Sequence, residues 1–166
     1  MTAAAPLVMV RCHGPGEMWA DFSRALGPEA MEDCYGTAAL PLDARWGETV
    51  WKFHEASGLV AAWASVAEYP KEPGNFELAL GVWPRHQGRG HRQSVLALVA
   101  DEVFTWRPSS MIVMQVFDTA QKHSAQCLRD AERGSAWVYS GRVWYPDALR
   151  TFTLTREAWE SEVWRA

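Results

Sequence analysis

The stretch GVWPRHQGRGHRQSVLALVADEVF, residues 81–104, most constrains how this chain can fold. It begins as an apolar strand, is stopped by a proline, and continues after a glycine-containing loop as a helix. The N-terminal region of that helix contains two glycines and three arginines: Gly88, Gly90, Arg85, Arg89 and Arg92. Glycine costs backbone entropy in this position, so its use usually brings a compensating gain. One such gain is to expose the unpaired main-chain N–H groups of the helix N-terminus to a ligand. The pattern therefore predicts an anion site.

A phosphate or pyrophosphate is the anion that best suits this loop. The N–H groups lie at the positive end of the helix dipole, and the arginines add positive charge. A Walker loop is excluded because no Gly-Lys-Ser/Thr follows, and a dinucleotide fingerprint is excluded because Gly90 is the last glycine of the stretch. Two close glycines also occur in ordinary tight turns, so the loop alone leaves both interpretations open.

The rest of the sequence predicts an α+β layered fold around one mixed sheet. Strands are expected over 6–13, 48–57, 59–69, 75–83 and 111–117, with two more within 136–155. Helices are expected over 16–26, 88–106 and 119–132. The unit at 75–117 predicts a parallel crossover, and the strand at 111–117 is expected to be buried on both faces. The apolar face of the middle helix is predicted to hold Val95, Leu98, Val99, Val103 and Trp106.

Length and composition fit a single soluble domain over residues 1–166. Apolar residues make up 48% and charged residues 22%, and no apolar run reaches the length of a membrane span. The N-terminus lacks the basic segment of a signal peptide, so a cytoplasmic location is expected. The three cysteines show no metal-ligand spacing, and no metal is expected. The net charge of -4 argues against a nucleic-acid binder.

The hexapeptide Arg85-His86-Gln87-Gly88-Arg89-Gly90 resembles the R/Q-x-x-G-x-G/A acyl-CoA signature of the GNAT acetyltransferase superfamily. MIVMQVF, the helix with Ser124 and the closing LTREAW (154–159) are most similar to the branch that includes the ribosomal-protein N-terminal acetyltransferases. The resemblance covers about residues 48–160. It implies a mixed, mostly antiparallel GNAT-like sheet of six to seven strands with helices on both faces. It also implies acetyl-CoA, or another acyl-CoA, as the donor.

The resemblance further implies a donor site and a general base. The main-chain N–H of Val82 is expected to polarise the thioester carbonyl. Glu77, on the strand before the loop, is the candidate base, with Glu55 and Glu68 as alternatives on neighbouring strands. A solvent-facing strand position is the competing interpretation of Glu77. The residues expected to bind the acyl-CoA are Val82, Arg85, Gln87, Gly88, Arg89, Gly90, His91, Arg92 and Gln121.

The helix at 119–132 departs from the family pattern. Gln121 stands where Asn is usual, and Cys127 and Leu128 stand where many members carry a Tyr that protonates the departing thiolate. A thiol pKa near ~8.5 makes thiolate departure accessible near neutral pH, so a missing Tyr is tolerable. Tyr139 and Ser124 are candidate substitutes, although packing is the commoner role of a strand Tyr. His86, His91 and His123 are expected to be polar residues that flank the site.

These features together predict an N-acyltransferase that transfers an acetyl group from acetyl-CoA to a primary amine by direct attack. The acceptor is expected to be a small molecule, a protein N-terminus or a lysine, and a homodimer is an option. Two other interpretations stay open at this point. One is a catalytically silent acyl-CoA-binding or interaction protein on the same fold. The other, disfavoured by the acidic charge balance, is a nucleic-acid-modifying transferase.

Overall fold

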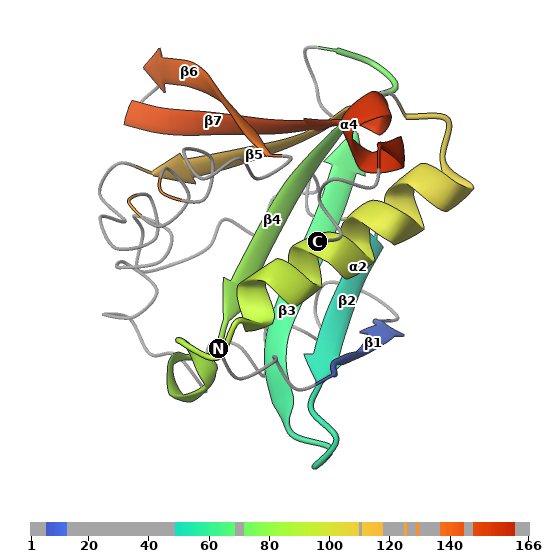
Figure 1. Cartoon of the computed structure of the whole chain (residues 1–166), viewed down its shortest axis with the longest axis vertical. Helices are drawn as coiled ribbons and strands as arrows, with labels where there is room; N and C mark the ends of the chain where they lie inside the picture. Colours follow the sequence, from blue (N-terminus) through green and yellow to red (C-terminus); the bar gives the residue numbers. More distant parts are fainter. Residues whose placement is uncertain are drawn as a thin grey trace.

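The computed structural model describes residues 6–12, 49–68, 72–109, 111–117, 137–144 and 148–161, together with Ala125 and Arg129. These residues form a seven-stranded sheet of order β1-β2-β3-β4-β5-β7-β6 (Figure 1). The strands are β1 Val8–Arg11, β2 Thr49–His54, β3 Val60–Glu68, β4 Phe76–Val82, β5 Met111–Phe117, β6 Val138–Trp144 and β7 Ala148–Thr155. The helical elements are η2 Pro84–His86, α2 His91–Trp106 and α4 Arg156–Glu160. No helix in the described part of the chain is long and apolar enough to cross a membrane.

The sheet is mixed and mostly antiparallel, as the sequence predicts. Every neighbouring pair is antiparallel except β4 and β5, which confirms the parallel unit at 75–117. The parallel pairing covers only Phe76↔Ile112, Glu77↔Val113 and Leu78↔Met114. Both strands continue beyond these pairs, and Figure 1 shows them diverging. Among the described strands, the second half of β4 therefore pairs with β3 alone.

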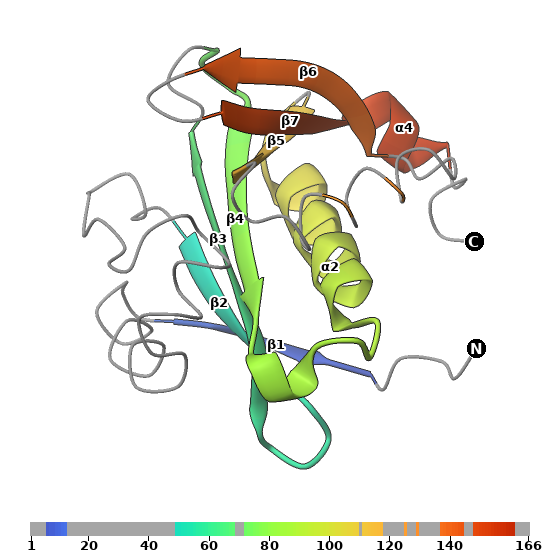
Figure 2. The same cartoon turned by 90° about the vertical axis from the view of Figure 1, so that its left-hand side faces the viewer.

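One face of the sheet packs against α2, and this contact forms the main core (Figure 2). Val95, Val99 and Val103 are fully buried, as the helical periodicity predicts. Leu98 is half-buried at the margin of the face. The prediction for Trp106 is wrong, because its side chain is 75% exposed. It is the last residue of α2, and Figure 1 shows that end of the helix extending beyond β2, β3 and β4.

The opposite face of the sheet is buried as well. Val50, Trp63 and Val113 are at most 4% exposed, and all three lie outside the cluster under α2. Val113 lies between Ile112 and Met114, which do belong to that cluster, so the first half of β5 is buried on both faces as predicted. The helix predicted over 16–26 lies outside the described residues. Within the helix predicted over 119–132, the structure describes Ala125 and Arg129, and both are helical.

The helix α4 has no counterpart among the elements that the sequence predicts. It begins after Thr155, whose hydroxyl accepts a hydrogen bond from the Ala158 N–H at 3.2 Å and so caps the helix. Its first residue, Arg156, donates to the main-chain carbonyls of Phe104, Arg107 and Ser109, at 2.8–2.9 Å. The LTREAW segment therefore holds the C-terminal end of α2, and its basic residue has a structural role here.

Candidate functional site

The segment between β4 and α2 turns sharply and presents main-chain N–H groups. One turn of 3-10 helix, η2, follows Trp83 and leads into residues 87–90, which we call the glycine loop. Gly88 and Gly90 have φ values of 75° and 78°. A Cβ at Gly88 would meet no atom within 4 Å, so the backbone angle and not a contact calls for glycine there. Gly90 is the N-cap of α2, and no side chain caps the helix.

The main-chain groups at the end of β4 alternate between the side of β3 and the opposite side. The Trp83 N–H donates to the Ala61 carbonyl of β3 at 2.9 Å. Because main-chain groups alternate along a strand, the N–H and C=O of Val82 point away from β3, toward the side from which β5 has diverged. The Gln87 side chain donates to the Val82 carbonyl at 3.2 Å. The glycine loop thus lies directly against the end of β4.

Three arginines give this region its positive charge. Arg85 and Arg89 are exposed, and the Arg89 side chain is 57% accessible. Arg92, in the first turn of α2, is half-buried. Cationic side chains beside the N-terminus of a helix favour an anionic ligand. The structure brings the predicted donor-site residues of the loop together at one place, and Gln121 lies outside the described residues.

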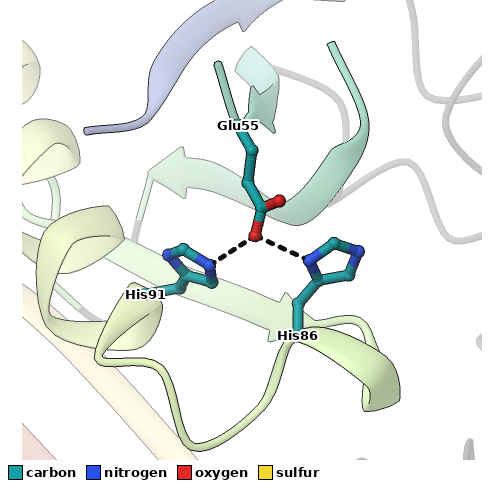
Figure 3. Close-up of side chains that lie close together, drawn as sticks. All are labelled: Glu55, His86 and His91. Carbon is teal, nitrogen blue, oxygen red and sulfur yellow. Dashed lines mark hydrogen bonds and ion pairs between the residues drawn. The ribbon is translucent and has the colours of Figure 1, made fainter. Parts of the chain in front are cut away.

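A cluster of side chains lies next to the glycine loop, and we call Glu55, His86, His91 and Arg89 the Glu55 cluster. Figure 3 shows the first three of them. The Nδ1 atom of His86 and the Nε2 atom of His91 each lie 2.8 Å from the same Oε1 atom of Glu55. The Arg89 Nη1 donates to that oxygen at 3.4 Å. The side chains of His86, His91 and Glu55 are 3%, 1% and 15% exposed. Both histidines flank the glycine loop, as expected, and each ring is also buried against a carboxylate, a feature that the sequence does not predict.

The cluster lowers the pKa of the Glu55 carboxyl below its ordinary value of 4.5. The hydrogen bond from His86 is the main cause, and the bond from His91 comes next. Burial of the carboxylate acts in the opposite direction, while the charges of His86 and Arg89 add to the lowering. A carboxylate with a lowered pKa takes up a proton less readily. Glu55 is thus a poor general base, and its alternative role as the base is not supported.

Glu77 lies on the face of the sheet opposite to α2. Its neighbours Phe76 and Leu78 are in the core under α2, and side chains alternate along a strand. Glu77 is half-buried and pairs in register with Ala67 of β3 and Val113 of β5. This position is next to the point where β4 and β5 part. Glu68, the other alternative base, is exposed and accepts a hydrogen bond from the Gly74 N–H at 2.8 Å.

The candidate proton donors are Tyr139 and Ser124. Tyr139 lies on β6 opposite Phe152 of β7, beside an irregularity of the register between Tyr139 and Gly141. Ser124 lies outside the described residues, as do His123, Cys127 and Leu128.

The Glu55 cluster is the feature that sequence reasoning missed. His86 and His91 bracket the glycine loop and could have been noticed as a pair. Their partner lies 31 and 36 residues earlier in the chain, and no local pattern connects it to them.

Comparisons with known proteins find similarity at the level of structure. No protein-family model matches the chain, and no curated protein matches its sequence. A spermidine N-acetyltransferase from Vibrio cholerae, solved with CoA and spermine, is 13% identical with a TM-score of 0.70, over 93% of this chain and 98% of that one. The aminoglycoside acetyltransferase AAC(6')-Ib, solved with coenzyme A and kanamycin, is 15% identical with a TM-score of 0.72, over 94% and 98%.

This chain has the GNAT acetyltransferase fold. At these identities the comparison establishes the fold alone. It confirms the mixed, mostly antiparallel sheet that the resemblance implies. Both similar structures are of enzymes named for amine substrates, spermidine and aminoglycosides. The finer likeness to the ribosomal-protein branch stays a prediction. Within a GNAT fold, the glycine loop and the parting strands form the candidate site.

Proposed function

We propose that this chain is an acyl-CoA-dependent N-acetyltransferase that transfers an acetyl group to a primary amine by direct attack. The observation that carries the proposal is the glycine loop at the uncapped N-terminus of α2, directly after the point where β4 leaves β5. Helix N-terminal N–H groups, two glycines of positive φ and three arginines suit the pyrophosphate of acetyl-CoA. The solved GNAT structures that resemble this chain were crystallised with CoA.

The proposed chemistry uses a main-chain group and a side chain of the same strand, β4. The N–H of Val82 points to the side left open by β5 and polarises the thioester carbonyl. Glu77, near the parting point, removes a proton from the attacking amine directly or through water. A base is needed because an alkylamine with a pKa of ~10.4 is almost fully protonated at neutral pH. Tyr139 and Ser124 stay the predicted donors of a proton to the departing thiolate.

The acceptor is proposed to be a small cationic amine. Spermine and kanamycin appear with the two similar enzymes, and both are basic amines. The net charge of -4 favours association with cations over anions. A protein N-terminus or lysine is the second candidate acceptor. A panel of amines with a free-thiol readout separates these classes, and fastest turnover of an acidic acceptor would contradict the proposal. CoA binding without turnover of any amine would favour the silent binding protein.

Binding of CoA to the parent and to Gly88→Glu tests the donor site. The new side chain adds a negative charge beside the pyrophosphate position, so binding should fall by about a hundredfold or more in calorimetry. Gly74→Glu is the matched control, because Gly74 also has a positive φ of 87° and open space at its Cβ. The control should share the backbone strain and keep its affinity. Equal binding by both variants would disprove the assignment of the loop.

The rate with an accepted amine tests Glu77 as the base. Glu77→Gln should lower kcat by about a hundredfold and leave CoA affinity unchanged. The loss should be greatest at low pH, where the amine is most fully protonated. Glu160→Gln, an exposed glutamate on α4, serves as the control. An unchanged rate and pH profile would return Glu77 to a structural role.

A further inference from the structure

The two histidines of the Glu55 cluster stand at the two ends of the glycine loop. His86 directly precedes residues 87–90, and His91 directly follows them. Both rings bond to one oxygen of Glu55, which lies just after β2 and outside the loop. A single carboxylate on a neighbouring strand connection therefore fixes where the loop begins and where it ends (Figure 3).

The carboxylate is needed because both imidazoles are buried. The other ring nitrogens, His86 Nε2 and His91 Nδ1, have no hydrogen-bond partner among the described residues. Each ring thus has one satisfied nitrogen, and Glu55 satisfies it in both cases. Removal of Glu55 would leave two buried rings without any partner in the described structure, a costly arrangement that the loop can relieve only by moving.

The geometry favours hydrogen bonds over a metal ion. The three donor atoms lie within 4.8 Å of one another, so they form a set that a divalent cation could use. A carboxylate oxygen at 2.8 Å from both nitrogens, however, needs an N–H on each facing nitrogen, whereas a metal needs a lone pair there. Metal-bound histidines also donate their second N–H to a partner, and neither ring has one in the described residues.

We propose that Glu55 is a positioning residue that holds the glycine loop in the shape that receives the pyrophosphate of CoA. This inference rests on the proposed function. Its action passes through His86 and His91, which tie the ends of the loop to the β2–β3 connection. A preformed loop loses less conformational entropy when the anion binds, and the affinity for CoA rises accordingly.

Arg89 has a different place in the cluster. Its contact with Glu55 is longer, at 3.4 Å, and its side chain is mostly exposed. An exposed pair of this kind is weak, so the guanidinium can turn to a phosphate while both histidine bonds persist. Glu55 therefore orients the Arg89 side chain without withdrawing it from the ligand.

Calorimetry with CoA tests the proposal through variants that remove or keep each donor. Glu55→Ala, His86→Ala and His91→Ala should each weaken CoA binding by about ten- to a hundredfold. His86→Asn and His91→Gln should recover most of the loss, because an Asn amide can replace Nδ1–H and a Gln amide can replace Nε2–H. Glu55→Gln keeps an acceptor oxygen and should fall between the parent and Glu55→Ala. Glu160→Ala, on α4 beyond the C-terminal end of α2, should bind as the parent does.

Pantetheine, which lacks the pyrophosphate, distinguishes loop positioning from general damage to the fold. Glu55→Ala should bind pantetheine as the parent does and lose affinity only for CoA. Equal loss for both ligands, no recovery by the amide variants, or unchanged CoA binding would each overturn the positioning role. Stoichiometric zinc in the purified protein, removable by a chelator, would overturn it in favour of a metal centre. Failure of the parent itself to bind CoA would overturn the proposed function as well.

Discussion

The two ends of α2 are finished in opposite ways. At its N-terminus the helix begins at a left-handed glycine, Gly90, with no side-chain cap. At its C-terminus the Arg156 guanidinium donates to the carbonyls of Phe104, Arg107 and Ser109. Each end of a helix leaves main-chain groups without intrahelical partners. The chain satisfies acceptors at the C-terminal end from within, and it leaves the donors at the N-terminal end without a side-chain cap, where we propose that the ligand binds.

Contacts around Arg156 show how thoroughly the C-terminal end is supported. The guanidinium also lies over the Phe104 ring, 5.1 Å from its centroid. The Trp159 indole N–H donates to Asp101 of α2 at 2.7 Å, and its ring contacts Phe104. At the N-terminal end, the described side chains that contact the residues bracketing the glycine loop include the distant Glu55, which bonds to His86 and His91.

The largest expected effect comes from a substitution at the N-terminal end of α2. Gly90→Glu should abolish CoA binding in calorimetry, a loss beyond about a thousandfold. The substitution places a carboxylate at the helix N-cap, on a backbone whose φ of 78° is unfavourable for any residue except glycine. The unfolding free energy should fall by only about 1 kcal/mol, the usual cost of a non-glycine residue at such an angle. A variant that still binds CoA would contradict the view that this end is kept open for an anion.

The second-largest expected effect comes from a substitution that affects the C-terminal end of α2. Arg156→Ala should lower the free energy of unfolding by about 3 kcal/mol, because three carbonyls lose a charged donor at once. CoA affinity should stay at the parent value, since the ligand site lies at the other end of the helix. Arg156→Lys is the control, because it keeps the positive charge but loses the planar guanidinium with its several N–H donors. Its free energy of unfolding should lie between those of the parent and Arg156→Ala. Denaturant unfolding measures the free energy of unfolding, and calorimetry measures the CoA affinity. A loss of affinity would show that the two ends of α2 are coupled.

The difference between the ends also explains what the sequence could predict. Pro84, Gly88 and Gly90 act on their own backbone, so the strand, the loop and the helix were predictable from local pattern. The parallel pairing of β4 with β5 followed from the same unit. Periodicity predicts that Trp106 is buried, yet its side chain is exposed. The pattern of apolar residues does not show where a helix extends beyond its sheet.

Long-range partners were beyond reach for a different reason. Arg156 acts on carbonyls about fifty residues earlier in the chain, at separations of 47 to 52. Glu55 meets His86 and His91 only because β2 and the end of β4 are brought to the same edge of the fold. Neither residue belongs to a spacing that predicts such contacts. The resemblance to a family supplied the donor loop, and the three-dimensional arrangement supplied what supports it.

The smallest expected effect sharpens the comparison through pH. The pKa of Glu55 is lower in the folded chain than its ordinary 4.5, mainly because His86 and His91 donate to it. Its ionised form therefore adds stability that is fully present above about pH 4.5 and is lost as the pH falls through the lowered pKa.

Glu55→Gln cannot ionise and lacks this component. The melting temperature of the parent should exceed that of Glu55→Gln by a few degrees at neutral pH, and the gap should close in strong acid. Arg156→Ala should show no comparable closing of its gap, because its loss does not depend on Glu55. A difference between the parent and Glu55→Gln that stays constant to the lowest pH at which both fold would mean that the cluster does not hold the loop through a carboxylate charge.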